Sequence, residues 1–440
     1  MHQWPPCVVR HIFGLSRHAD SDVQAIASGE LTADVSAGET AKTRSGRRRG
    51  RVLWLAVHKW IGLSAGALLL LIGLTGSILV FHLEIDEWLN PRLFEVAPRA
   101  GGESAYRPLD EWVEAARTVL PPGGRLTFAQ YPRHDGVSVR FNALVPSKPG
   151  DSGPSNNAVY HVAVDPYRAE VTGVRLVRPA GWAGAIPRTF IGFVFALHYA
   201  LLLPRFGEPP FGDTVVAILG LILILSLGSG IVLWWPRTSQ WRGALTIRYP
   251  AHPRRLNFDL HKTAGVYFLL VLLGLFLSGV YLNLRAPFHA VVRMFSPTID
   301  RYAVRSQAAP GGQSITLSQA MQRVRERFPI GRPEWLYLPR NERGTYTVCQ
   351  RDVPGISALL TRRCVVLDQY SGEILHVESP QGASAGQHFI QWQWPIHSGQ
   401  LFGLAGRWIV FLSGLVCPLL FGTGWYLWWR KRRGVAGRAA

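Results

Sequence analysis

Cysteine and acidic side chains are scarce in this sequence. Among 440 residues, 28 Asp and Glu stand against 47 Lys and Arg, which gives a formal net charge of +19. The basic residues cluster beside apolar runs and do not follow a soluble face, so the charge indicates orientation in a membrane and not nucleic-acid binding. The sequence also contains no hydrolase motif, phosphate-binding loop or nicotinamide fingerprint that would indicate those chemistries.

The four cysteines do not predict a metal site. Cys7 and Cys417 have no metal-ligand spacing. Cys349 and Cys364 flank a turn-like stretch, where they either form a disulfide or stay as two unpaired thiols on a pair of strands. The sequence leaves these two alternatives open.

The N-terminal 50 residues lack an apolar core of signal-peptide length ahead of the basic stretch that ends at Arg51. No cleaved secretory leader is therefore expected. The sequence predicts a disordered, basic tail that precedes a membrane anchor.

Four apolar runs are long enough to cross a hydrocarbon core of about 30 Å, for which about 20 helical residues suffice. These runs cover residues 52–81, 214–235, 260–284 and 403–429. Two shorter runs, at 187–203 and 386–400, are broken or bounded by proline and are expected to be interfacial or re-entrant. The sequence thus predicts a polytopic membrane protein with four spanning helices.

Lys and Arg predict the orientation, because they concentrate in the short segments on the cytoplasmic side. Residues 41–51 contain six of them, the loop 236–259 contains five, and the tail 430–440 contains five. Residues 84–186 instead mix eleven basic with twelve acidic residues, the balance of a translocated domain. Both termini are therefore expected in the cytoplasm, with 84–186 and 286–396 outside.

An internal repeat organises the chain. The stretch LAVHKWIGLSAG at 55–66 aligns with FDLHKTAGVYFL at 258–269, and VDPYRAEVTG aligns with LDQYSGEILH at the same offset of 203 residues. Two independent matches at one offset indicate a duplication, in which each half consists of a span, an outside domain, an interfacial segment and a second span. Each outside domain has one helical run followed by alternating, strand-like runs, which predicts a small α+β module with an antiparallel sheet.

Three repeated features carry a resemblance to a known family: the His-Lys start of a span, the Asp-x-Tyr-x-x-Glu turn and the Leu-Trp-Trp end of a span. Together they resemble the PepSY-associated transmembrane family and, within it, the inner-membrane haem-containing ferric-siderophore reductases. The resemblance covers about residues 50–432. It implies a bacterial protein of iron uptake with four spans and two PepSY modules, which passes electrons to a periplasmic acceptor.

The predicted fold class is a mainly α-helical, multi-pass protein of the bacterial inner membrane, with short interfacial helices and two small α+β PepSY-like periplasmic modules. The predicted segments are a disordered cytoplasmic tail (1–50), transmembrane helix 1 (51–83), a first PepSY-like domain (84–186), an interfacial helix with transmembrane helix 2 (187–235), a cytoplasmic loop (236–259), transmembrane helix 3 (260–285), a second PepSY-like domain (286–385), an interfacial segment with transmembrane helix 4 (386–429), and a cytoplasmic tail (430–440).

Four histidines lie at matching membrane depths. His58 and His261 start spans that run outward, whereas His198 and His397 precede spans that run inward. An ionisable side chain at membrane depth is costly and indicates a function. Because a haem needs an axial ligand on each face, and two imidazoles suit its iron to electron transfer, the sequence predicts two bis-histidine b haems, one near each membrane face.

A single histidine at such a depth has simpler roles as well. Taken alone, any one of the four is better explained by hydrogen bonding at the headgroup level, and it is the pairing by duplication that favours ligation. A proton relay or a zinc site is the remaining alternative for the set. Zinc is disfavoured, because no Cys, Asp or Glu lies at ligand spacing beside them within the apolar runs. His82 is a further candidate ligand for the outer site or a third site, although its counterpart in the repeat is Arg285.

Basic side chains near these histidines are candidate partners for haem propionates, because arginine and lysine bind carboxylates. The candidates are Lys59 and Lys262 near the inner pair, and Arg188, Arg205 and Arg407 near the outer pair. The two lysines are explained equally well as orientation signals.

Three functions follow. In the first, the protein carries electrons from a cytoplasmic reductant or the quinol pool to a ferric siderophore or other periplasmic iron chelate, because reduction weakens the hold of hard oxygen ligands on iron. In the second, it is a membrane-tethered PepSY protein that binds partners or modulates a protease without redox activity, which leaves the four histidines unexplained. A transporter is the third, but the spans show no buried carboxylates or broken helices of a coupled carrier.

Overall fold

The structure is a computed structural model that describes residues 22–147, 157–204, 206–207, 209–236, 240–309, 311–354 and 362–436. The chain divides into two units, Met1–Val57 and His58–Ala440. The strands and the candidate site residues belong to the second unit.

Among the described residues, three helices are long and apolar enough to cross a membrane. They are α1 (Asp22–Val80), α6 (Phe211–Trp234) and α13 (Gly403–Ala436). A fourth candidate span is bent by 60°, where α8 (Pro253–Tyr267) meets α9 (Leu269–Asn283). The chain is therefore a helical membrane protein with three candidate spans, or four if the bent pair is one span.

Two sequence predictions need correction here. Residues 22–50 are helical and continuous with the first apolar run, although disorder was predicted for them; no proline interrupts this stretch. The third span is broken at Phe268, although no broken helix was predicted, because its apolar run contains no proline to mark a break. Residues 1–21, for which disorder was also predicted, lie outside the described residues.

Short helices connect the long ones and the strands. The two runs predicted as interfacial contain α5 (Phe190–Ala200) and α12 (Ala385–Ser398). The others are α2 (His82–Leu89), α3 (Pro91–Phe94), α4 (Leu109–Thr118), α7 (Trp241–Leu245), α10 (Arg285–Arg293) and α11 (Leu317–Arg327), with 3-10 turns at Gly102–Ala105, Gly181–Ala185, Arg301–Ala303 and Gln400–Phe402.

Eight strands form one antiparallel sheet in the order β4-β3-β2-β1-β5-β6-β7-β8. They are β1 (Arg125–Gln130), β2 (Val139–Pro146), β3 (Asn157–Asp165), β4 (Glu170–Arg178), β5 (Arg332–Tyr337), β6 (Thr345–Arg351), β7 (Arg363–Asp368) and β8 (Ile374–Glu378). At the centre β1 pairs with β5, so that Phe128 lies opposite Tyr337. The sequence predicts antiparallel strands in both outside segments, but it does not predict that they join in one sheet.

The sheet has one apolar face, because alternate residues of a strand point to opposite sides. On this face Ala129, Phe141 and Leu336 are fully buried. They belong to one hydrophobic cluster with residues of α4 and α11, including Trp112 and Met321. Both halves of the chain therefore share a single core outside the membrane helices.

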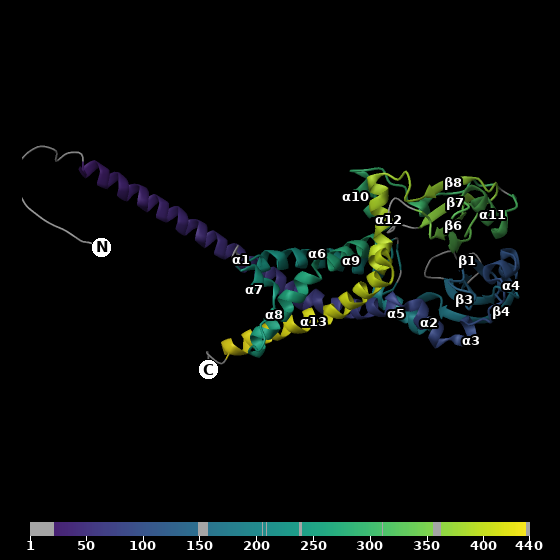
Figure 1. Ribbon diagram of the computed structural model, residues 1–440, viewed down its shortest axis with the longest axis horizontal. Coiled ribbons are helices and arrows are strands. Elements are labelled where there is room, and N and C mark those ends of the chain that lie inside the picture. The colour runs from purple at the N-terminus through teal and green to yellow at the C-terminus, as the bar shows by residue number, and fades with distance from the viewer. Residues whose placement is uncertain are drawn as a thin grey trace, which may run out of the picture. The chain divides into compact units, whose positions relative to one another are not determined.

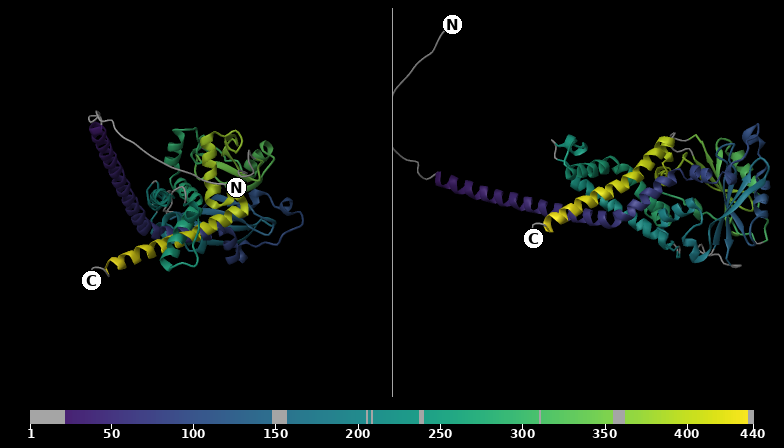
Figure 2. Two further views of the ribbon diagram at one scale, coloured as in Figure 1. Left: turned by 60° about the vertical axis from the view of Figure 1, so that its left-hand side comes forward. Right: turned by 90° about the horizontal axis from the view of Figure 1, so that it is seen from below.

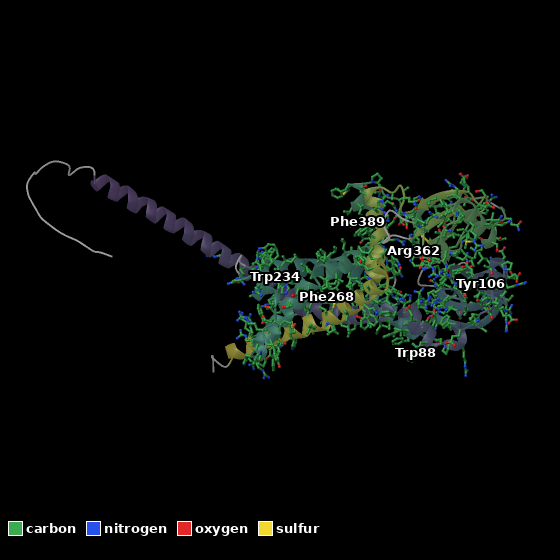
Figure 3. All side chains as sticks on the ribbon, in the orientation of Figure 1. Trp88, Tyr106, Trp234, Phe268, Arg362 and Phe389 are labelled. Atoms are coloured by element: carbon green, nitrogen blue, oxygen red, sulfur yellow. A yellow bond between two sulfur atoms is a disulfide. The ribbon has the colours of Figure 1, made fainter. Side chains whose placement is uncertain are left out.

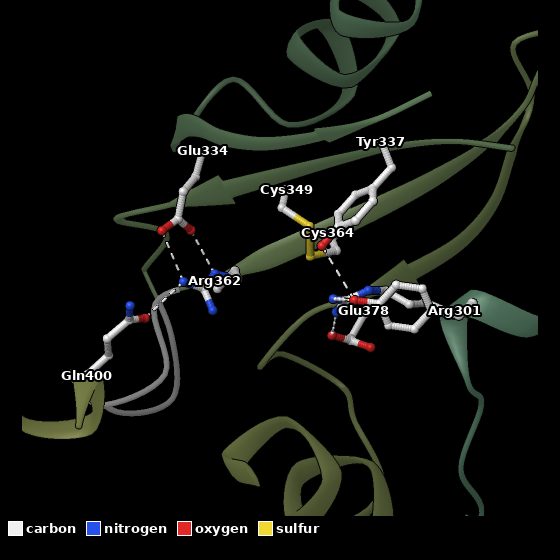
Figure 4. Close-up of a disulfide and its surroundings, with 9 residues drawn as sticks. Arg301, Glu334, Tyr337, Cys349, Arg362, Cys364, Glu378 and Gln400 are labelled. Carbon is white, nitrogen blue, oxygen red and sulfur yellow. Dashed lines mark hydrogen bonds and ion pairs between the residues drawn. A yellow bond between two sulfur atoms is a disulfide. The ribbon is translucent and has the colours of Figure 1, made fainter. Parts of the chain in front are cut away.

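The opposite face of the sheet is polar and aromatic. Gln130 lies opposite Trp335, and Trp335 lies opposite Cys349. Cys349 and Cys364 form a disulfide, and Cys364 lies opposite Glu378 (Figure 4). The disulfide was one of the two alternatives that the sequence left open.

The strands gather at one end of the helices of the second unit, next to α2, α5 and α12 (Figures 1 and 2). Figure 3 shows Arg362 where the strands meet α12. The side chain of Arg362 donates a hydrogen bond to Gln400, in the turn that follows α12. The polar face of the sheet is thus brought toward the helices that carry the histidines.

Candidate functional site

Two pairs of histidines meet between the helices, and each pair takes one residue from each half of the chain. The ring centres of His58 on α1 and His261 on α8 are 6.1 Å apart, with the ring planes at 86°. Those of His198 on α5 and His397 on α12 are 6.0 Å apart, with the planes at 65°. The structure thus brings together the histidines that the sequence paired.

The two pairs lie at different levels of the helices. His198 contacts Gly76 of α1, which is 18 residues beyond His58 on the same helix. At a rise of 1.5 Å per residue the separation along α1 is about 27 Å, close to the thickness of a hydrocarbon core. We call His198 and His397 the sheet-side pair, and His58 and His261 the remote pair.

The remote pair is held by α6 and α13. The Nδ1 atom of His58 lies 3.1 Å from the carbonyl oxygen of Ser226 and 3.0 Å from the hydroxyl oxygen of Ser229. Similarly, Nδ1 of His261 lies 3.0 Å from the carbonyl oxygen of Leu420 and 3.0 Å from the hydroxyl oxygen of Thr423. In both cases the hydroxyl residue follows the carbonyl residue by one helical turn.

The sheet-side pair is held in the same way by α1 and α9. The Nδ1 atom of His198 lies 3.0 Å from the carbonyl oxygen of Ile72 and 3.2 Å from the hydroxyl oxygen of Thr75. The Nδ1 atom of His397 lies 2.9 Å from the hydroxyl oxygen of Ser278, and Leu275 is its backbone partner. All four rings therefore have the same type of anchor.

These anchors define the tautomer of each ring. The four hydroxyl groups already donate their own hydrogens to backbone carbonyls of their helices, so each presents a lone pair to Nδ1. The proton of the imidazole is therefore on Nδ1, and the lone pair is on Nε2. Among the described residues, no protein atom forms a hydrogen bond with Nε2 of any of the four histidines.

The spacing of the rings fits a metal between two Nε2 atoms. About 2 Å for each metal–nitrogen bond and about 1 Å from nitrogen to ring centre add up to a centre-to-centre distance of about 6 Å. The described residues contain no group of three or more His, Cys, Asp or Glu that could hold a metal ion, which disfavours zinc. The donor set fits an iron whose other four ligands come from a porphyrin.

A glycine follows each of the four hydroxyl residues and faces the ring that this residue anchors. A Cβ atom built on the glycine would lie 3.0 to 3.5 Å from Cε1 of the ring, at Gly76, Gly230, Gly279 and Gly424. The four hydroxyl anchors were not predicted from the sequence. Their Ser/Thr-Gly dipeptides repeat at the offsets of 203 and 194 residues, between Thr75 and Ser278 and between Ser229 and Thr423, and this was the signal that could have found them.

A cavity of about 1170 Å³ extends from the sheet-side pair to the polar face of the sheet. Both His198 and His397 line it, and on the sheet side so do Phe128, Trp335 and Tyr337. The remote pair does not line this cavity. A ligand in the cavity would therefore meet the sheet-side pair and not the remote pair.

The structure places His82, the fifth histidine candidate, at the start of α2 in the wall of the cavity. Its Nδ1 atom lies 2.8 Å from the carbonyl oxygen of Leu79, and its ring packs edge-on against Phe195 at 5.2 Å. His82 thus contacts an aromatic ring and is not paired with another histidine.

The arginine candidates for haem propionates lie in different surroundings. Arg407 lines the cavity and donates hydrogen bonds to the carbonyl of Val80 and to Glu84. Arg188 is exposed and is not part of the cavity wall. Arg205 lies outside the described residues. Of the two described arginines, Arg407 is the one placed to meet a group bound at the sheet-side pair.

The lysine candidates near the remote pair already have protein partners. Lys262 forms an ion pair with Asp259 at 2.9 Å and donates a hydrogen bond to the carbonyl of Gly243 at 2.6 Å. Lys59 lies over the ring of Trp60 at 4.5 Å. These contacts give both lysines a structural role near the basic end of the helices.

The fold and the site together define a class: a helical membrane protein that holds two histidine pairs at separate levels, one of them in a cavity that is also lined by an antiparallel sheet. The chain belongs to the PepSY-associated transmembrane family, because the family described as "PepSY-associated TM region" matches residues 55–431. This match confirms the resemblance to that family seen in the sequence. The comparison with curated proteins finds no match.

Proposed function

We propose that the protein carries electrons along its helices through two b haems and delivers them to a ferric siderophore, or another iron chelate, in the cavity. The observation that carries this proposal is the common anchor of the four histidines. Each ring has its proton fixed on Nδ1 by a carbonyl and a hydroxyl, and each pair has a ring separation of 6.0 or 6.1 Å.

When bound, the haems would supply one-electron iron couples, and the two imidazoles of each pair would hold the iron in a form that suits electron transfer and not oxygen chemistry. The role of the protein is to hold the haems. Hydrogen bonds from Nδ1 orient the rings and raise the basicity of Nε2. The glycines beside the rings let each imidazole approach the helix that anchors it.

Two sites at separate levels divide a crossing of about 30 Å into shorter steps. The sheet-side pair is the one that meets the cavity, so it is the site from which an acceptor would be reduced. Each ferric iron takes up one electron. The electrons come from a cytoplasmic reductant or from the quinol pool of the membrane, where each quinol gives up two electrons and two protons. Iron(II) is held less tightly than iron(III) by hard oxygen ligands, so reduction favours release.

The positive-inside rule supports an orientation with both termini in the cytoplasm and the sheet in the periplasm of a bacterial inner membrane. A binding protein or protease modulator without redox activity is the second candidate. It leaves the matched anchors of four histidines at two levels without a purpose, and for this reason we favour the electron carrier.

The experiment is optical spectroscopy of the purified protein, expressed with ample haem. We expect a Soret band with about two haems per chain, and a dithionite-reduced form that does not bind carbon monoxide rapidly, because both axial positions are filled. Addition of a ferric chelate should reoxidise the reduced haems, whereas the gallium(III) complex of the same chelator should not. A folded protein without haem absorbance would refute the proposal.

Substitution of the glycines beside the histidine rings should lower haem occupancy to different degrees, according to how close the new Cβ lies to the ring. A Cβ at Gly76 would lie 3.0 Å from the His198 ring, whereas one at Gly279 would lie 3.5 Å from the His397 ring. We expect Gly76→Ala to displace the ring at a cost of about 1–3 kcal/mol and to lower the occupancy of the sheet-side haem. Gly279→Ala should keep the occupancy of the natural protein.

The measurement for this series is haem content per chain with the low-spin electron paramagnetic resonance signal. Gly62→Ala is a matched control on the same helix as Gly76, since a Cβ there meets nothing within 4 Å. Equal haem content in Gly76→Ala and Gly62→Ala would show that the His198 ring does not lie against Gly76 as the structure has it.

A further inference from the structure

The wall of the cavity is basic. Nine arginines line it, against five carboxylates. Two carboxylates behind the wall lower the excess of positive charge from four to two: Glu87 pairs with Arg133 at 2.5 Å, and Asp300 lies 3.8 Å from Arg285. The wall is thus basic by two charges, and positive charge in a confined space favours an anionic ligand.

Two of these arginines lack a close carboxylate. The Nε atom of Arg285 lies 3.8 Å from Asp300, and that of Arg351 lies 3.8 Å from Asp352. Both distances exceed a hydrogen bond. By contrast, a close ion pair such as that of Arg362 with Glu334, at 2.8 Å, neutralises its charge locally. Arg285 and Arg351 are thus cavity arginines with charge available to a ligand.

The unsatisfied polar atoms of the wall are mostly donors. Among the described residues that line the cavity, the buried atoms without a hydrogen-bond partner are the Nε atoms of five arginines, including Arg285 and Arg351, the Nε1 atom of Trp394 and one acceptor, Oδ1 of Asn142. Buried polar groups normally have partners, and an unpaired one is costly. These Nε atoms are themselves buried, whereas the side chains of Arg285 and Arg351 are 37% and 27% exposed, so a ligand would meet the two arginines through their other atoms.

Aromatic rings stand beside the charged groups. The guanidinium of Arg362 lies 3.9 Å from the ring centre of Trp335, and that ring packs edge-on against Trp394 at 5.7 Å. The guanidinium of Arg285 lies 3.9 Å from the ring centre of Tyr302. Figure 4 shows Arg362 and Tyr337 on the same side of the sheet as the disulfide. Such rings favour a ligand that presents flat, aromatic groups.

We infer that the cavity selects iron chelates with net negative charge and aromatic oxygen donors, such as tris(catecholate) complexes, over neutral tris(hydroxamate) complexes, and that Arg285 and Arg351 carry this selection. A tris(catecholate) complex of a trivalent metal has a charge of −3, because each of its three ligands carries two negative charges. A tris(hydroxamate) complex has none. This inference rests on the proposed function only in taking the ligand to be an iron chelate.

Binding is tested with gallium(III) complexes, which have the charge and shape of the iron(III) complexes but are not reduced, so the readout does not depend on haem. We expect the full-length protein in lipid nanodiscs to bind the tris(catecholate) complex at least about tenfold more tightly than the tris(hydroxamate) complex, as measured by quenching of tryptophan fluorescence. The preference should shrink as salt is added, because salt screens the attraction between the arginines and the anionic complex but does not affect the fit of the complex to the cavity.

Substitutions locate the selection. Arg285→Gln and Arg351→Gln should each weaken binding of the tris(catecholate) complex about tenfold and leave binding of the neutral complex unchanged. Arg285→Lys, which keeps the charge, should retain most of the affinity. Arg107→Gln is the matched control, since Arg107 is 54% exposed, pairs with Glu111 on α4 and does not line the cavity.

Equal binding of the two gallium complexes, or unchanged binding in both glutamine variants, would overturn the inference. Thermal unfolding of each variant shows whether it is folded. If Arg285→Gln does not fold, the affinity of Arg285→Lys tests the role of Arg285. Failure of the proposed function looks different: the anionic gallium complex binds, but its ferric counterpart does not reoxidise the reduced protein.

Discussion

His397→Ala should remove the sheet-side haem and spare the remote one. His397 and His198 are the two Nε2 donors at that level, and loss of one leaves an iron with a single axial ligand. Substitution of a residue that only hydrogen-bonds to a metal ligand typically lowers the affinity for the metal about 10–100-fold. Loss of the ligand itself should lower the affinity further. We expect haem content to fall from about two to about one per chain.

The remaining haem should stay six-coordinate in this variant, because its ligands, His58 and His261, belong to other helices and another level. His58→Ala should give the complementary result, and the double variant should be colourless. Absorbance with haem quantification measures each case. Any haem that stays at the altered site should bind carbon monoxide in the reduced protein, which separates a five-coordinate site from an intact one.

His82→Ala is the matched control for this series. It removes an imidazole from the same cavity, but the ring of His82 contacts Phe195 and not a histidine. We expect two six-coordinate haems in this variant. Loss of a haem from His82→Ala, together with full retention in His397→Ala, would mean that His82 and not His397 is the ligand.

Asp86→Ala should cause the largest loss of stability among single changes in the polar contacts between the helices and the sheet. Asp86 on α2 is 2% exposed and pairs with Arg140 of β2 at 3.3 Å and with Arg175 of β4. Removal of one partner of a buried ion pair typically costs about 3–5 kcal/mol, because a buried charge is left uncompensated. Here two guanidinium groups would lose their carboxylate.

The neighbouring His161 cannot replace the lost carboxylate. Burial, with Arg140 and Arg175 nearby, holds the pKa of His161 well below its usual value, so its ring is neutral and accepts a hydrogen bond from Arg175 at 3.1 Å. The thermal unfolding midpoint should therefore drop in Asp86→Ala. Asp86→Asn, which keeps the shape of the side chain, should fall between this variant and the natural protein.

Glu111→Gln is the control for charge alone. Its ion pair with Arg107 is exposed, and exposed pairs contribute about 0–1 kcal/mol. The midpoint of this variant should stay near that of the natural protein. A midpoint for Asp86→Ala no lower than that for Glu111→Gln would show that the contact of α2 with the strands is not a major source of stability.

The histidine pairs could be found from the sequence because the repeat carries them. His58 and His261 occupy equivalent positions at the offset of 203, and His198 and His397 at the offset of 199. Each also lies in or beside an apolar run, where a titratable group is conspicuous. Pairing by symmetry therefore needed no knowledge of the packing of the helices.

Other parts of the site depend on contacts between distant segments. Ser229 and Thr423 look like ordinary polar residues of apolar helices until the helices pack, and only then do their hydroxyl groups reach His58 and His261. From the sequence, Lys262 is a candidate partner for a propionate or an orientation signal, and its ion pair with Asp259, one turn earlier on the same helix, is seen only in the folded chain. The basic wall of the cavity likewise exists only in the folded chain.

The central pairing of β1 with β5 has a consequence for biogenesis. Roughly 200 residues separate the two strands, so at about 5–20 residues per second a ribosome needs roughly 10–40 s to supply the second after the first. Throughout that interval the edge of β1 has unpaired amide and carbonyl groups, which are a template for wrong partners. The nascent N-terminal half therefore depends on shielding of this edge, by a chaperone or by its own loops, until the C-terminal half is synthesised.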